Sequence, residues 1–142
     1  MIMGFAIEDI QANRIKKIPK GRINISSSPH IKSVKEIKPP FSGKKALEVM
    51  FEFITKYEPN IGEIKIKGVV IYSGDKIKEQ LKTWEKEKKL IKETDVEIKN
   101  FLFRKCLSLG ITISEEMQLP PPLMFPHVVA KEQKKPDLSY IG

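Results

Sequence analysis

Two apolar runs between Ala46 and Gly74, separated by Glu58-Pro59-Asn60, constrain the fold of this chain more than any other feature. In the first run, residues 47, 49, 51 and 53 are apolar and share one face of a strand, because successive strand side chains point to opposite faces. The two glutamates between them then lie on the other face. The second run, residues 64–72, begins with alternation and becomes continuously apolar, as a strand does on entering the covered middle of a sheet. We therefore predict an antiparallel hairpin.

The residues before this hairpin are predicted to extend its sheet. Residues 5–18 alternate imperfectly and end at Pro19-Lys20-Gly21, which favours a long first strand closed by a turn over a helix. Residues 22–26 alternate again, and we expect Pro29 to interrupt that strand because proline lacks a backbone donor. Residues 31–37 are predicted to form a weak strand. The two prolines of residues 39–43 then predict a loop.

After Gly74 the apolar period becomes that of a helix. Four apolar residues recur at intervals of four, three and seven and predict a helix over residues 75–92: Ile77, Leu81, Trp84 and Ile91. Asp75 or Ser73 is the expected N-cap. Lysines and acidic residues are nearly balanced on the rest of this helix, which is typical of a solvent-exposed face.

A second helix is predicted from Thr94, which with Glu97 matches a capping box. Apolar residues then recur every three or four positions, and the stripe continues in phase across Gly110, so one long helix to about Gln118 is favoured over a broken one. A helix this apolar is expected to be covered by the sheet and also by a partner subunit.

Residues 119–126 contain four prolines and are therefore predicted to be extended. They pack either against their own sheet, which is favoured, or form one wall of an apolar groove that recognises a partner. Residues 131–142 are polar and are expected to form a flexible tail. At 142 residues the chain is most simply one domain, spanning residues 1–130.

Composition predicts a soluble, cytoplasmic protein that does not insert into a membrane. The single cysteine, Cys106, cannot form an intramolecular disulfide, and the chain has neither a signal-peptide pattern nor an apolar run long enough to span a membrane. The net charge of +8 is concentrated between residues 10 and 45, which contain ten basic residues and one acid. This excess can attract polyanions such as RNA, and the alternative is a lysine-rich surface whose acidic partners lie elsewhere in the fold. Candidate nucleic-acid contacts are Arg14, Lys16, Lys17, Lys20 and Arg22.

No catalytic or metal-binding pattern occurs in the sequence. His30 and His127 lack carboxylate or cysteine neighbours at ligand spacing, and the glycines are scattered singly rather than grouped in a phosphate-binding loop. Cys106 lies on an apolar helical stripe, where a thiol is a small core residue more often than a nucleophile. We therefore predict a binding protein rather than an enzyme, with no cofactor and no metal.

The order of elements and three short motifs resemble the SecB export-chaperone family. Residues 68–73, Gly-Val-Val-Ile-Tyr-Ser, resemble its apolar last strand. Residues 102–108, Leu-Phe-Arg-Lys-Cys-Leu-Ser, resemble the start of its long helix, and Leu119–Leu123 occupies the place of its proline-containing extended stretch. The resemblance implies an α+β fold in which a four-stranded antiparallel sheet carries C-terminal helices packed on one face.

The resemblance also implies a function and a set of contacts. It implies a dimer or tetramer whose apolar grooves hold unfolded or nascent polypeptide without ATP. The residues at matching positions, and hence the candidate contacts with a client, are Val70, Tyr72, Leu119, Leu123 and Phe125. Two departures limit the resemblance: the family is acidic and docks an export motor, whereas this chain carries +8, and the lysine-rich helix over residues 75–92 has no counterpart. The alternative functions are an RNA- or ribosome-associated protein and an accessory subunit with an obligate interface.

Overall fold

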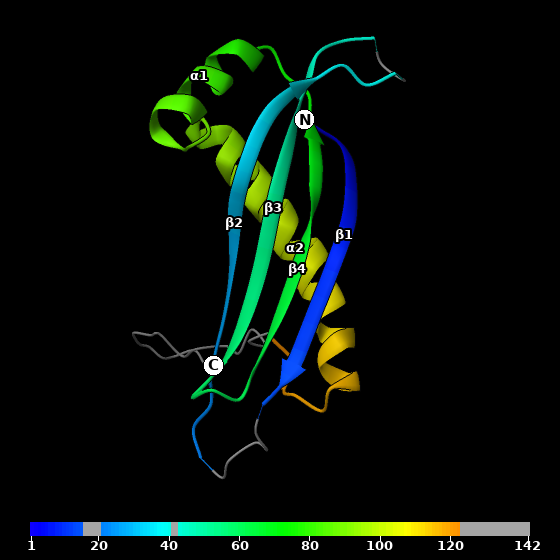
Figure 1. Ribbon diagram of the computed structural model, residues 1–142, viewed down its shortest axis with the longest axis vertical. Helices are drawn as coiled ribbons and strands as arrows, with labels where there is room; N and C mark the ends of the chain where they lie inside the picture. Colours follow the sequence, from blue (N-terminus) through cyan, green and yellow to red (C-terminus); the bar gives the residue numbers. More distant parts are fainter. Residues whose placement is uncertain (16–20, 41–42, 123–142) are drawn as a thin grey trace, which may run out of the picture.

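The computed structural model describes residues 1–15, 21–40 and 43–122, which form a four-stranded antiparallel sheet and two helices (Figure 1). The elements in chain order are β1 (Ile2–Arg14), β2 (Asn24–Ile37), β3 (Ala46–Glu58), β4 (Gly62–Tyr72), α1 (Ile77–Glu87) and α2 (Lys92–Glu116). The order of strands across the sheet is β1-β4-β3-β2. Helix α2 lies on one face of the sheet, and α1 contacts β2. The predicted α+β fold is therefore confirmed.

The central hairpin is confirmed as β3 and β4. Its register runs from Leu47 opposite Tyr72 to Tyr57 opposite Gly62. The turn contains Asn60 at a φ of 53°, a left-handed conformation that asparagine tolerates better than most residues. The alternating apolar residues of β3 are at most 2% exposed, so the period-two pattern correctly identified the covered face: Leu47, Val49, Phe51 and Phe53.

The first two strands lie at opposite edges of the sheet, since β1 pairs with β4 and β2 pairs with β3. Strand β1 ends at Arg14, so the predicted extension to residue 18 is wrong at Ile15, and residues 16–18 lie outside the described residues. The predicted break at Pro29 is also wrong, because β2 runs unbroken through it. An edge strand tolerates proline where the missing N–H would face outward, and Pro29 sits opposite Phe53 on such a strand.

Helix α1 is shorter than the sequence predicted, because it ends at Glu87 rather than near residue 92. Lys88 adopts a left-handed conformation, with φ of 56°, and closes the helix by donating its N–H to the carbonyl oxygen of Trp84. The N-cap residue is Lys76 and makes no side-chain cap, so the expected caps Asp75 and Ser73 are wrong.

Helix α2 is continuous from Lys92 to Glu116, which confirms one long helix across Gly110. A Cβ at Gly110 would lie 3.3 Å from Cγ of Pro122, so this glycine leaves room for the chain that returns over the helix. The predicted capping box is wrong: α2 begins two residues before Thr94, and its N-cap, Ile91, forms no side-chain hydrogen bond.

The core lies between α2 and the sheet. One side of α2 is buried at every fourth residue, namely Thr94, Ile98, Leu102, Cys106, Gly110 and Ser114. The flanks of this stripe also pack on the sheet: the ring of Phe101 lies edge-on to Phe5 at 5.2 Å, and the ring of Phe103 lies edge-on to Phe53 at 5.5 Å. These contacts within one chain account for part of the broad apolar stripe, and cover by a partner subunit stays a prediction.

Candidate functional site

The three candidate client contacts that the structure describes do not form one site. Val70, Tyr72 and Leu119 are 0%, 8% and 5% exposed, and Leu123 and Phe125 lie outside the described residues. Val70 and Tyr72 lie on the covered face near the start of α2, whereas Leu119 follows the end of that helix. A helix of this length spans nearly 40 Å, so the two groups are far apart.

Tyr72 belongs to a polar network that ties β4 to both helices. Its hydroxyl donates to Oε1 of Glu97 at 3.1 Å and lies 3.5 Å from Oγ1 of Thr94. Oγ1 of Thr94 accepts from Nε2 of Gln80 at 2.7 Å, and Oε1 of Gln80 accepts the N–H of Ile91 at 3.3 Å. Burial raises the pKa of Tyr72, and the Glu97 carboxylate adds to that rise. The Thr94–Glu97 pair is thus a tertiary link, which the sequence pattern alone presented as a helix cap.

The chain after α2 is anchored at the opposite end of the sheet. The Tyr57 hydroxyl donates to the carbonyl oxygen of Pro120 at 2.8 Å, and the N–H of Leu119 donates to the carbonyl oxygen of Ser114 at 2.8 Å. Burial raises the pKa of Tyr57 from 10.0 to about 12. For residues 119–122, these contacts support the favoured prediction that the proline segment packs against its own sheet.

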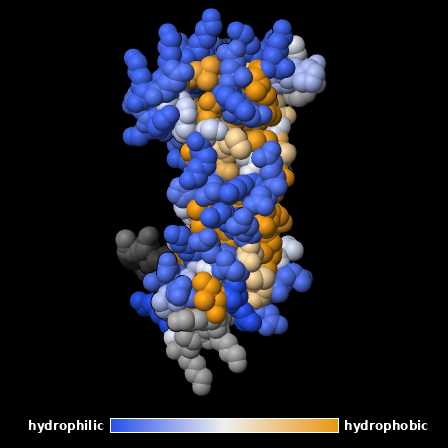
Figure 2. Space-filling model, viewed as in Figure 1, coloured by the Kyte–Doolittle hydropathy of each residue, from blue (hydrophilic) through white to orange (hydrophobic). Residues whose placement is uncertain are grey.

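The other face of the sheet is not covered by any described element (Figure 1). Residues on this face alternate with the buried ones, and Val69 of β4 lies opposite Met50 of β3 and Ala6 of β1. With Ile71 these residues form what we call the open-face patch. Met50 is 36% exposed, and Figure 2 shows apolar surface among charged side chains on the molecule in this orientation. The patch leaves apolar atoms in water.

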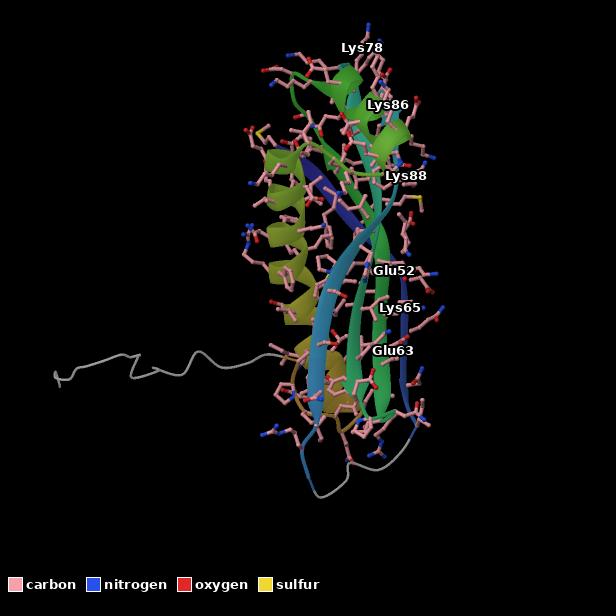
Figure 3. The ribbon with its side chains drawn as sticks, turned by 90° about the vertical axis from the view of Figure 1, so that its left-hand side faces the viewer. Glu52, Glu63, Lys65, Lys78, Lys86 and Lys88 are labelled. Atoms are coloured by element: carbon pink, nitrogen blue, oxygen red, sulfur yellow. The ribbon has the colours of Figure 1, made fainter. Side chains whose placement is uncertain are left out.

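Ion pairs border the open-face patch. The Glu52 carboxylate lies 3.9 Å from the ammonium group of Lys32 and 3.8 Å from that of Lys67, and so links three strands. Glu48 pairs with Lys35 at 3.3 Å. Figure 3 shows Glu52 projecting from the side of the sheet opposite α2. The lysine side chains of these pairs are 45–64% exposed and the carboxylates 14–26%, so solvent reaches the pairs and each contributes little stability. They place hydrogen-bonding groups of both signs beside the patch.

The predicted nucleic-acid contacts are only partly within the described residues. Arg14 ends β1 opposite Gly62, and Arg22 precedes β2; both side chains are exposed. Lys16, Lys17 and Lys20 lie outside the described residues. Binding of RNA by this set remains a prediction.

The described residues contain little that suggests catalysis. Burial raises the pKa of the Cys106 thiol to about 12, so it is a poor nucleophile near neutral pH. Over residues 1–15, 21–40 and 43–122, no three His, Cys, Asp or Glu side chains are grouped so that they could hold a metal ion. Within the same residues, no helix is long and apolar enough to cross a membrane.

Comparison with known proteins supports the fold. No protein-family model and no curated protein sequence matches the chain. Among solved structures, the chain is similar to a Mycobacterium tuberculosis SecB-like chaperone, Rv1957, in complex with a ChAD peptide from the Rv1956 HigA1 antitoxin. The TM-score is 0.52 at 13% sequence identity, and the match covers 85% of this chain and 82% of the other. At this identity the match shows that the chain has a distant SecB-like fold.

Proposed function

We propose that this protein binds unfolded or nascent polypeptide without ATP, as a chaperone of the SecB-like kind. The observation that carries the proposal is the fold, which is similar to that of a SecB-like chaperone in complex with a peptide. We further expect a homo-oligomer, a dimer or tetramer, in the cytoplasm.

The open-face patch is the surface that we assign to the client. Its apolar atoms are in water before binding, so covering them with an extended apolar segment gains about 25 cal/mol per Å² before ordering costs. Val70, Tyr72 and Leu119 are buried and can reach a client only if the elements that cover them move away. Leu123 and Phe125 remain proposed contacts from the C-terminal segment. The bordering ion pairs supply polar partners for the client backbone.

The proposal is tested by suppression of aggregation of a reduced, unfolded client. The variant Met50→Glu/Val69→Glu places two charges in the patch, at residues that face each other across β3 and β4. Val96→Glu is the control for a charge added outside the patch, because Val96 is 48% exposed and lies on α2, away from the open face. The oligomeric mass of each protein is measured first.

We expect the wild type and Val96→Glu to suppress aggregation at low and high salt, because apolar burial is not screened by salt, and the double variant to lose suppression. Equal suppression by all three proteins would contradict the assignment of the client to this face. Salt-sensitive RNA binding without client protection would instead support the nucleic-acid alternative, because phosphate contacts weaken steeply with ionic strength.

A further inference from the structure

A cavity of about 530 Å³ lies where β2, the end of α1 and the start of α2 meet, and its lining is strongly basic. Five lysines line it: Lys32, Lys88, Lys89, Lys92 and Lys99. We call it the basic cavity. Asp95 is the one carboxylate in its lining, so positive charge exceeds negative. A concave surface of one sign concentrates ions of the opposite sign.

The protein neutralises only part of the positive charge of the cavity, because Lys32 pairs with Glu52 outside the lining. Asp95 is engaged by the ammonium group of Lys99 at 3.1 Å. Among the residues that the structure describes, no carboxylate forms an ion pair with Lys88, Lys89 or Lys92. Three exposed cations therefore share one concave surface, which makes an anion the complementary ligand.

The end of α1 places these lysines at the cavity. The backbone of Lys88 is in the left-handed conformation, so the chain turns away from the axis of α1 at this residue. Leu90 then points into the core and is 5% exposed. The ammonium group of Lys88 lies 5.8 Å from the centre of the Trp84 ring. Figure 3 shows Lys88 in the same part of the molecule as α1, above Glu52.

The lining favours an acidic peptide over a nucleic acid. Single strands of RNA are commonly held by stacking bases on exposed aromatic rings. Of the two aromatic rings in the lining, Trp84 is only 9% exposed, and the exposed imidazole of His30 is hydrogen-bonded through Nε2 to Oγ of Ser28 at 3.0 Å. Leu90 and Ile31 give the cavity an apolar part beside its lysines. A peptide with apolar and carboxylate side chains complements both the apolar part of the cavity and its lysines.

The cavity adjoins the surface already assigned to the client. Lys32 lines the cavity, and its ammonium group also pairs with Glu52 on the open face. A client that covers the open-face patch and continues past β2 therefore meets the cavity next. We infer that the basic cavity binds an acidic segment of a polypeptide client, and so selects clients in which aspartate or glutamate flanks an apolar stretch. This inference rests on the proposed function.

The test uses three synthetic peptides with one apolar core and flanks of glutamate, glutamine or lysine, and measures their dissociation constants by fluorescence anisotropy at low and high salt. The variant Lys88→Glu/Lys89→Glu/Lys92→Glu reverses the charge of three residues that line the cavity. The matched control, Lys78→Glu/Lys82→Glu/Lys86→Glu, makes the same change in net charge at exposed α1 lysines that do not line it. A single-stranded RNA oligonucleotide serves as competitor.

We expect the wild type to bind the glutamate-flanked peptide most tightly. The cavity variant should lose about tenfold in affinity for that peptide and retain its affinity for the glutamine-flanked one, whereas the control should keep the preference. The preference should weaken at high salt. Equal affinities for the glutamate and glutamine peptides, or equal losses in both triple variants, would overturn the inference. Displacement of the peptide by RNA at lower concentration than by acidic peptide would also overturn it.

Failure of the proposed function has a different signature. In that case the wild type binds none of the three peptides, including the uncharged one. Binding of the glutamine-flanked peptide that is weakened by Met50→Glu/Val69→Glu, without any preference for acidic flanks, supports the proposed function and rejects the cavity as a client site.

Discussion

The two faces of the sheet are built from the same strands but differ in where their apolar atoms lie. On β3, Val49 and Phe51 are at most 2% exposed beneath α2, whereas Met50 between them is 36% exposed on the open face. The covered face has already released its water on folding, so its side chains stabilise the chain and cannot also drive client binding. The apolar atoms of the open face are still in water, so the free energy gained by covering them is available for binding.

The difference also explains how charge is distributed. The polar side chains of the covered side form hydrogen bonds inside the fold, as Thr94 does with Gln80. On the open face Glu52 pairs with Lys32 and Lys67 at the surface. Substitutions under α2 should therefore change stability, and substitutions on the open face should change binding.

The largest loss of stability is expected at Leu102, which is fully buried. Leu102→Ala removes packed atoms and leaves a cavity between α2 and the sheet, which should lower the free energy of unfolding by roughly 3–5 kcal/mol. Urea denaturation followed by circular dichroism measures this loss. Met50→Ala is the open-face control, and an equal loss there would show that the two faces do not differ as described.

A smaller loss is expected for Gly68→Ala, where the covered face leaves no space. A Cβ at this position would lie 2.2 Å from the carbonyl oxygen of Ala6 and 3.0 Å from the ring of Phe51. Strand β1 must shift, at an expected cost of about 1–3 kcal/mol, and amide hydrogen exchange should increase along β1. Gly74→Ala is the control, since its Cβ would meet no atom closer than 3.4 Å. Exchange rates that do not change in β1 would reject this account of Gly68.

Alkaline pH should weaken the covered face selectively. Burial raises the pKa of Tyr57 from 10.0 to about 12 and that of Cys106 from 9.0 to about 12. Both groups stay protonated to higher pH in the folded state than in the unfolded state. Their contribution to the free energy of unfolding is therefore fully present below pH 9.0 and is lost as the pH rises toward 12. Chemical denaturation at a series of pH values should show this fall, and Tyr57→Phe/Cys106→Ala should reduce its slope. An unchanged slope would mean that other groups cause it.

The smallest change in stability is expected at Met50. Met50→Glu should alter the free energy of unfolding by no more than about 0.5 kcal/mol, because this side chain lies on an exposed surface. The same substitution should weaken binding of an uncharged apolar peptide, measured by anisotropy. A large loss of stability together with a loss of binding would leave the two faces indistinguishable.

Much of the fold followed from local pattern. Alternation over residues 47–53 correctly predicted which face of β3 is covered, and the apolar stripe that stays in phase across Gly110 correctly predicted one continuous helix. Features that depend on distant partners were missed. Pro29 is tolerated because β2 is an edge strand, and strand order is not encoded in a local period.

The site was less predictable than the fold. Val70 and Tyr72 were selected as client contacts from a resemblance, but the alternation that makes β4 a strand places both under α2. The basic cavity could not be found from sequence, because Lys32 and Lys88 belong to distant segments that only the tertiary fold brings together. Alternating strand patterns show that one face is buried, but not what the other face binds.

The most direct test of the open-face assignment is photo-crosslinking of an unfolded client, with a photoreactive amino acid placed at Met50 or at Val96. Both positions are exposed, but Met50 lies on the open face and Val96 on α2. We predict that the client crosslinks strongly from position 50 and weakly from position 96. Crosslinking that is equal at both positions, or stronger at position 96, would contradict the assignment of the client to the open face.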